Sequence, residues 1–148
     1  MKQPPLVHSI SYGQLESETD AQSMQAFSTE VMKLGVRGVT VLVSTGDDGV
    51  AGVQARSSEG LCAYNPQWPA TCPYTTAVGA TQGPEEGKPE EVACSASNPN
   101  TFITTGGGFS ATFKTPDYQA AAVAAFLANK SAALGPGFNA AGRGYPDV

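Results

Sequence analysis

The sequence has little positive charge. Its 148 residues include 8 Lys and Arg against 13 Asp and Glu, which gives a formal net charge of -5. A surface of this sign repels phosphate groups, so we expect no nucleic-acid partner. The sequence also lacks any run of about 18 apolar residues, and we therefore expect no membrane span. Residues 1–5 lack the apolar core of a signal peptide, so we expect either a cytosolic protein or a chain whose beginning is missing.

Cysteine and histidine are also scarce. The only cysteines are Cys62, Cys72 and Cys94, and none of them forms a C-x-x-C pair. The single histidine, His8, lies in an apolar run and is expected to be a buried structural residue, so we expect no metal site. A disulfide between Cys62 and Cys72 would tie a loop and leave Cys94 as an odd thiol. Three reduced, buried thiols are the alternative, and the pairing stays open.

The chain alternates between strand and helix patterns. Residues 6–11 and 39–44 are typical of strands, and residues 19–34 between them are typical of a helix that Thr19 and Gln22 cap and Gly35 ends. The apolar face of this helix is expected to be core, and it consists of Ala21, Met24, Phe27, Val31 and Leu34. The pattern is a βαβ unit, so we predict an α/β fold in one domain.

Later segments are less regular. We expect a third strand over residues 74–81, a solvated turn over 83–89, and an amphipathic helix over 116–129 that lies on the sheet. Three consecutive glycines at residues 106–108 indicate either unusual dihedral angles or a close approach by another segment, and a flexible loop is the alternative.

An apolar strand that runs into an acidic, glycine-flanked loop is the most informative feature. The loop is Gly46-Asp47-Asp48-Gly49, and it follows the strand at residues 39–44. A parallel sheet places such a loop at its carboxyl edge, where α/β folds bind ligands. Asp47 closing an Asx turn is the plainer alternative. A phosphate cradle ranks last, because two aspartates without Lys or Arg repel phosphate.

Six segments in order resemble the sedolisin family, the serine-carboxyl peptidases: PLVHSISYG (5–13), STGDDG (44–49), WPATCPY (68–74), AVGAT (77–81), GGGFS (106–110) and GRGYPDV (142–148). The resemblance implies a subtilisin-like fold, with a mainly parallel sheet and helices on both faces. It also implies a serine nucleophile activated by a glutamate, which an aspartate holds.

The resemblance assigns roles to two parts of the chain. Asp47 matches the aspartate that helps to form the oxyanion hole, and Gly46 beside it is expected to contact the substrate. Ser11, Tyr12 and Gly13 match the segment that pairs with the substrate backbone, and Gly13 would leave room for the substrate. The alternative for residues 11–13 is an ordinary junction between a strand and a loop.

A carboxyl group donates a hydrogen bond to an oxyanion only when it is protonated. Burial and neighbouring carboxylates are therefore expected to keep Asp47 neutral at moderately acidic pH, and the reaction is expected to require acid.

Other catalytic positions of the family do not match this chain. Glu16 and Asp20 imitate the glutamate–aspartate pair, but the family carries that pair on a helix before residues 11–13. We interpret Glu16, Glu18 and Asp20 as acidic residues near a helix N-terminus. No serine here matches the nucleophile, and the prodomain and the calcium loop also have no counterpart.

We therefore interpret residues 1–148 as the central fragment of an acid-acting serine-carboxyl peptidase. The isolated chain is expected to be inactive, and the complete enzyme is expected to bind calcium. Its substrate would be a peptide or protein, and its location secreted or lysosomal. Exopeptidase or endopeptidase action, side-chain preference and oligomeric state stay open. The alternative function is a non-catalytic pseudopeptidase domain that binds a peptide or a protein partner.

Overall fold

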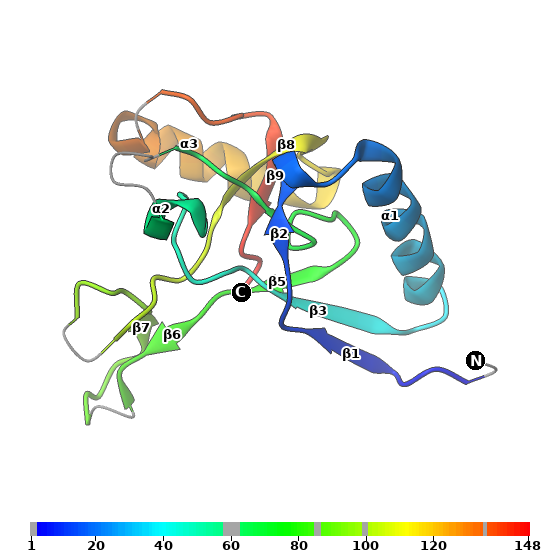
Figure 1. The fold of residues 1–148 in the computed structure, drawn as a ribbon, viewed down its shortest axis with the longest axis horizontal. Coiled ribbons are helices and arrows are strands. Elements are labelled where there is room, and N and C mark those ends of the chain that lie inside the picture. The colour runs from blue at the N-terminus through cyan, green and yellow to red at the C-terminus, as the bar shows by residue number, and fades with distance from the viewer. Residues whose placement is uncertain (1–2, 58–62, 85–86, 99–100, 135) are drawn as a thin grey trace.

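The fold contains a three-stranded parallel sheet, which lies in the lower right part of the view in Figure 1. The computed structural model describes residues 3–57, 63–84, 87–98, 101–134 and 136–148. The strand order is β1-β3-β5, and the strands are Val7–Ile10, Thr40–Ser44 and Thr76–Val78. The middle strand β3 carries the predicted apolar run, and its Val41 and Val43 are buried. The predicted βαβ unit is confirmed, because β1 and β3 are parallel.

Helix α1, Ala21–Gly35, connects these two strands. It begins after Asp20, whose carboxylate accepts a hydrogen bond of 2.8 Å from the Ser23 amide. Hydrogen bonding to the Ser23 side chain and to this amide lowers the pKa of Asp20. The expected cap at Thr19 was wrong. The Thr19 hydroxyl is engaged elsewhere, since it accepts from the Gln14 side chain and donates to the Leu15 carbonyl.

The end of α1 also differs from the prediction. Gly35 is still helical, and the chain turns at Gly38, which has a φ of 76°. That left-handed conformation favours glycine, so Gly38 rather than Gly35 provides the turn.

The core lies between α1 and the sheet. Its first cluster joins Val31 of α1 to Val41, Val43 and Ala77 of the sheet. A second cluster contains Met24, Trp68 and Cys72. The ring of Trp68 lies edge-on to Phe27 at 5.3 Å and stacks on Phe113 at 5.6 Å. Burying each large apolar side chain stabilises a fold by about 1.5–3 kcal/mol.

The expected strand at residues 74–81 is interrupted. It is divided into β5 and the short strand β6, Thr81–Gln82, because the two residues between them bond elsewhere. The Gly79 amide donates to the Val148 carbonyl, and the Ala80 amide donates to the Thr105 hydroxyl. The remaining short elements are β2 (Gln14–Leu15), the 3-10 helix η1 (Glu16–Glu18), α2 (Gln54–Ser57), β4 (Gln67–Trp68) and β7 (Val92–Ala93).

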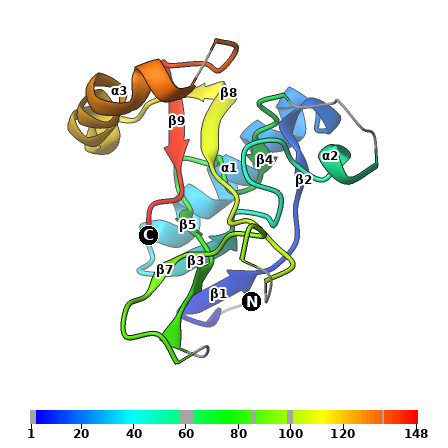
Figure 2. The ribbon, with the colours of Figure 1, turned by 90° about the vertical axis from the view of Figure 1, so that its left-hand side faces the viewer.

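A second sheet is formed by β8, Gly108–Lys114, and β9, Gly142–Tyr145, which run antiparallel. The predicted helix at 116–129 begins as a 3-10 turn, η3, at Asp117–Gln119 and continues as α3, Ala120–Leu134. It packs on the β8–β9 pair rather than on the parallel sheet, with Phe126 6.0 Å from Phe109. Helices α3 and α1 lie on opposite sides of β9 (Figures 1 and 2). In the described part of the chain, no helix combines the length and apolarity needed to cross a membrane.

Candidate functional site

The carboxyl ends of the three parallel strands surround a cleft of about 300 Å³. Ser11 follows β1, Gly46 and Asp47 follow β3, and Gly79 and Ala80 follow β5, and all five line this cleft. The fold thus brings three of the predicted site residues, Ser11, Gly46 and Asp47, to one edge of the sheet. Tyr12 and Gly13 lie beside the cleft but are not part of its lining.

The segment at residues 11–13 is exposed, and Tyr12 exposes 81% of its surface. Its side chain is therefore available to a ligand. The predicted reason for Gly13 was wrong. A β-carbon at Gly13 would lie 2.6 Å from the Trp68 carbonyl oxygen, so the chain itself fills the space that was expected for a substrate.

The loop at residues 46–49 has the glycine geometry that the sequence indicates. Gly46 and Gly49 have φ angles of 91° and 58°, in the left-handed region. The loop is held by the neighbouring segment at residues 104–106: the Gly106 amide donates to the Gly46 carbonyl at 2.8 Å, and the Thr104 amide donates to the Asp47 carbonyl at 2.8 Å.

The three glycines at residues 106–108 serve a close approach and a special dihedral angle. A β-carbon at Gly106 would lie 1.8 Å from the Thr45 carbonyl oxygen. Gly108 has a φ of 141°, which other residues rarely adopt. The flexible-loop alternative is therefore wrong, because this segment is bonded to the Gly46–Asp47 backbone.

The carboxyl of Asp47 is exposed, so its expected burial was wrong. Within the described residues it makes no hydrogen bond, and the Asx-turn alternative is not formed there. The neighbouring Asp48 pairs with Arg56 of α2. That hydrogen bond and the charge of Asp48 raise the pKa of Arg56, and the charge of Asp47 adds to the shift.

Glu16 lies in the first turn of η1, so its expected place near a helix N-terminus holds, but its burial was not expected. It exposes only 4% of its surface, because its carboxylate binds to β8. The expectation also holds for Asp20, which caps α1, and Glu18 is exposed and accepts a hydrogen bond from Gln54 at 3.2 Å. No local pattern distinguishes Glu16 from Glu18, since the partners of Glu16 lie 94 and 95 residues away.

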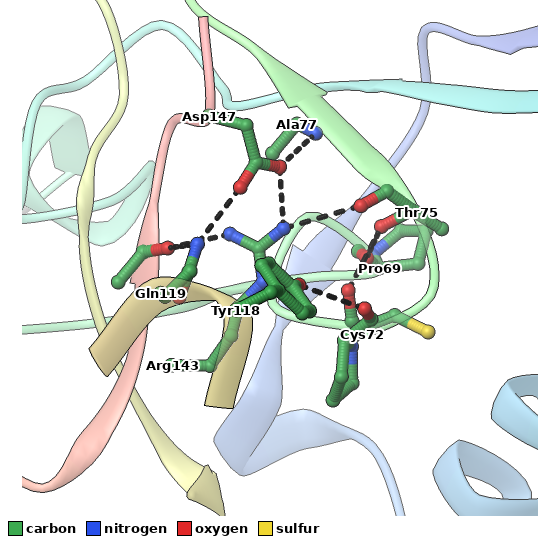
Figure 3. A network of polar contacts seen from close by, with 10 residues as sticks. Pro69, Cys72, Thr75, Ala77, Tyr118, Gln119, Arg143 and Asp147 are labelled. Atoms are coloured by element: carbon green, nitrogen blue, oxygen red, sulfur yellow. Dashed lines mark hydrogen bonds and ion pairs between the residues drawn. The ribbon is translucent and has the colours of Figure 1, made fainter. Parts of the chain in front are cut away.

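A second set of polar residues that the sequence interpretation missed fixes β9 against β5 (Figure 3). Arg143 is fully buried, and its Nη2 atom donates to Asp147 Oδ2 at 2.5 Å. The same carboxylate oxygen accepts from the Ala77 amide at 2.7 Å. The other oxygen accepts from Gln119 Nε2 at 2.8 Å. An arginine between two glycines, four residues before an aspartate, is the sequence signal for this pair.

The hydroxyl of Tyr118 lies at the side of this cluster and donates to the Pro73 carbonyl at 2.8 Å (Figure 3). Burial raises the pKa of Tyr118, and the positive charge of Arg143 opposes that shift. Tyr118 thereby joins the start of the α3 region to the loop before β5.

The described cysteines are reduced. Cys72 is free and buried, and its Sγ lies 3.4 Å from the Ser28 hydroxyl, while Cys94 is also free and buried. Of the two alternatives that the sequence leaves open, the disulfide is therefore not formed at Cys72, and Cys62 lies outside the described residues. Residues 3–57, 63–84, 87–98, 101–134 and 136–148 contain no group of three or more His, Cys, Asp or Glu that could hold a metal ion. His8 is half-buried, and its Nε2 atom has no hydrogen-bond partner among these residues.

Curated proteins and solved structures match the chain, whereas protein-family models do not. No protein-family model matches the chain. The chain is 40% identical over 146 residues to tripeptidyl-peptidase 1 of Macaca fascicularis. The aligned region covers 97% of this chain and 24% of that protein. It is 38% identical over 169 residues to tripeptidyl-peptidase sed1 of Aspergillus fumigatus, and this alignment covers 99% of this chain and 25% of that protein. The chain thus spans about a quarter of the length of these curated relatives.

Among solved structures, the chain resembles Pseudomonas sedolisin, a serine-carboxyl proteinase that was determined in complex with two molecules of pseudo-iodotyrostatin. The TM-score is 0.65 and the sequence identity is 25%. The match covers 97% of this chain and 37% of the sedolisin chain.

Proposed function

Because the chain belongs to the sedolisin family of serine-carboxyl peptidases, we propose that it forms the central part of an enzyme that hydrolyses peptide bonds in acid. The subtilisin-like α/β fold expected from the sequence is confirmed by the likeness to sedolisin. The substrate is a peptide or protein, attacked by a serine so that an acyl-enzyme forms and is then hydrolysed. The location that fits an acid requirement is secreted or lysosomal.

The observation that carries this proposal is the exposed Asp47 carboxyl beside a cleft at the carboxyl end of β3. The Asp47 carbonyl accepts a hydrogen bond from the Thr104 amide, while the Asp47 side chain makes no hydrogen bond within the described residues. A protonated Asp47 therefore has its proton available for the oxygen of a substrate carbonyl. It stabilises the negative charge that develops on that oxygen in both halves of the reaction.

Ser11, Tyr12, Gly13 and Gly46 are proposed to contact the substrate. The exposed segment at residues 11–13 continues from β1 toward the cleft, so an extended peptide can pair with its backbone as an added strand. Gly46 lines the same cleft immediately before Asp47, where its backbone can lie close to a scissile carbonyl.

The described residues contain no group of three or more His, Cys, Asp or Glu that could hold a metal ion. Calcium binding by the complete enzyme stays a prediction.

The experiment that tests the proposal uses the full-length protein that contains this chain, with a peptide library as substrate at pH 3–7 (about the range in which carboxyl groups titrate). We expect hydrolysis in acid, and we expect Asp47→Ala to lower kcat by about 100- to 1000-fold with little change in ground-state peptide affinity. Product analysis also separates release of tripeptides from internal cleavage. Unchanged turnover in Asp47→Ala would overturn the oxyanion role.

The alternative of a non-catalytic peptide-binding domain uses the same exposed segment at residues 11–13, since backbone pairing needs no nucleophile. A full-length protein that binds peptides at every pH tested but cleaves none of them would favour it.

A further inference from the structure

The carboxylate of Glu16 makes a buried link to β8. Its Oε1 atom accepts a hydrogen bond of 2.5 Å from the hydroxyl of Ser110, and its Oε2 atom accepts one of 2.8 Å from the Ala111 amide. Ser110 is completely buried, so it is closed to a substrate and does not serve as a nucleophile. The role of the Glu16–Ser110 pair therefore follows from the two segments of the chain that it connects.

The direction of the hydrogen bond between the two side chains is fixed. The Ser110 oxygen already accepts from the Thr112 amide at 3.1 Å and from the Phe113 amide at 2.8 Å. A hydroxyl has two acceptor lone pairs and one proton, so the proton of Ser110 goes to Glu16. These bonds occur where the register of β8 against β9 shifts, between Phe109 and Lys114. Ser110 thus bonds two amides at the irregular part of the strand.

The link connects two segments that contribute residues to the candidate site, residues 11–13 and the Gly46–Asp47 loop. Glu16 follows the exposed segment at residues 11–13 by three positions, and its amide is also bonded to the Pro66 carbonyl. On the other side, Ser110 follows the glycines at 106–108, and Gly106 holds the Gly46 carbonyl. Glu16 is therefore tied through β8 to the loop that carries Asp47.

Burying a carboxylate to join two segments costs free energy, because the charged group loses its hydration. Among the described residues, the ion pairs do not include Glu16, so its charge is balanced by hydrogen bonds alone. Packed apolar side chains often stabilise a fold as well as a buried charge does, but they do not fix one geometry through directional bonds. The arrangement at Glu16 fits a requirement for a defined spacing.

We propose that Glu16 is a positioning residue, which sets the spacing between residues 11–13 and the Gly46–Asp47 loop by clamping β8 at Ser110. This proposal rests on the proposed function, because the spacing matters for catalysis only if a peptide contacts both segments. A displacement of about 1 Å in a catalytic arrangement lowers the rate by about 100-fold. The effect is expected in kcat rather than in KM.

The first measurement needs no activity. Amide hydrogen exchange is compared in the 148-residue chain and its Glu16→Gln variant, which keeps the size of the side chain but loses one acceptor. We expect faster exchange both at residues 11–15 and at residues 104–111. Glu18→Gln is the matched control, because Glu18 is exposed and lies only two positions away. Wild-type exchange at both segments in Glu16→Gln would overturn the proposal.

The second measurement uses the full-length protein at a temperature well below its melting transition. We expect Glu16→Gln to lower kcat by about 10- to 100-fold with little change in KM. Ser110→Ala should lower it similarly, and the double variant should be no worse than the more affected single variant, since both changes break one link. Should Glu16→Gln not fold, Ser110→Ala tests the same link. It removes the hydrogen bond to Glu16 Oε1, but the bond from the Ala111 amide still holds the buried Glu16 carboxylate.

The outcomes separate the two proposals. If the wild-type full-length protein cleaves no peptide, the proposed function fails, and positioning for catalysis fails with it. If the wild type is active and Glu16→Gln has a lower melting temperature but an unchanged kcat, Glu16 is only a stabilising residue and the inference is wrong.

Discussion

Gly106 lies so close to Thr45 that a β-carbon on the glycine would come within 1.8 Å of the Thr45 carbonyl oxygen. The obstacle is backbone, which cannot rotate away as a side chain can. The same glycine donates its amide to the Gly46 carbonyl. The contact therefore fixes the loop that carries Asp47.

We expect Gly106→Ala to displace this loop. The change should destabilise the fold by about 1–3 kcal/mol, as overpacking does, and should lower kcat of the full-length protein by about 100-fold. Gly35→Ala is the control, because Gly35 lies in α1 with no atom within 4 Å of its added β-carbon, and alanine there should stabilise by about 0.5–1 kcal/mol. Thermal melting and steady-state kinetics measure both effects. Equal activity in the two variants would show that the close contact does not position the loop.

The parts of the fold that depend on local pattern could be predicted. The strand at residues 39–44 and the helix after Asp20 are visible in the spacing of their apolar residues, and the parallel pairing follows from their alternation. The helix cap was misassigned because Thr19 and Asp20 are both suitable caps. The choice is made by Gln14, whose side chain bonds to the Thr19 hydroxyl.

The parts that depend on distant contacts could not be predicted. Glu16 and Glu18 have the same chemistry, and only the position of Ser110 in space makes one of them buried. Asp47 was expected to be buried against the edge of the sheet, but the left-handed turn at Gly46 precedes it and its side chain is exposed. The local sequence indicates where this loop lies, and not which way its side chains point.

The proposed role of Asp47 predicts a dependence on pH. A carboxyl group donates a hydrogen bond only when it is protonated, whereas the amide of asparagine donates at every pH. We therefore expect the ratio of kcat for Asp47→Asn to kcat for the wild type to increase with pH. Full pH profiles of both full-length proteins measure this ratio. A ratio that stays constant from acid to neutral pH contradicts the prediction.

The ion pair between Arg143 and Asp147 predicts a large effect on stability. Arg143 is fully buried, so Asp147→Asn leaves an uncompensated charge in the core, which should cost about 3–5 kcal/mol. Glu30→Gln is the control, since it removes an exposed pair with Lys33 that should contribute at most about 0.5 kcal/mol. Chemical denaturation measures the two free energies of unfolding. Similar losses in both variants would mean that the buried pair has no special role.

Tyr145 predicts a loss of stability in alkali. Burial raises the pKa of its hydroxyl to about 12, above the ordinary value of about 10 for an unfolded chain. The folded state therefore holds this proton more tightly, and the resulting stability is full below pH 10 and is lost as the pH rises to about 12. The loss should be about 2–3 kcal/mol, measured as unfolding free energy against pH. In Tyr145→Phe this part of the pH dependence should vanish, and its persistence would assign the effect to other groups.

A large groove beside α3 predicts how the 148-residue chain behaves by itself. The groove has a volume of about 1280 Å³, and Phe126 in its wall exposes 44% of its surface. An apolar dye should therefore bind there, and Phe126→Lys should reduce its fluorescence. Phe102→Lys is the matched control, because Phe102 is 92% exposed but does not line the groove. A preparation that melts sharply as a monomer and binds no dye would show that the groove is closed to small apolar molecules. Equal effects of the two lysine substitutions would place the dye elsewhere.

The 148-residue chain should also cleave no peptide, since none of its serines matches the nucleophile of the family. Cleavage of a peptide by this chain would contradict that prediction.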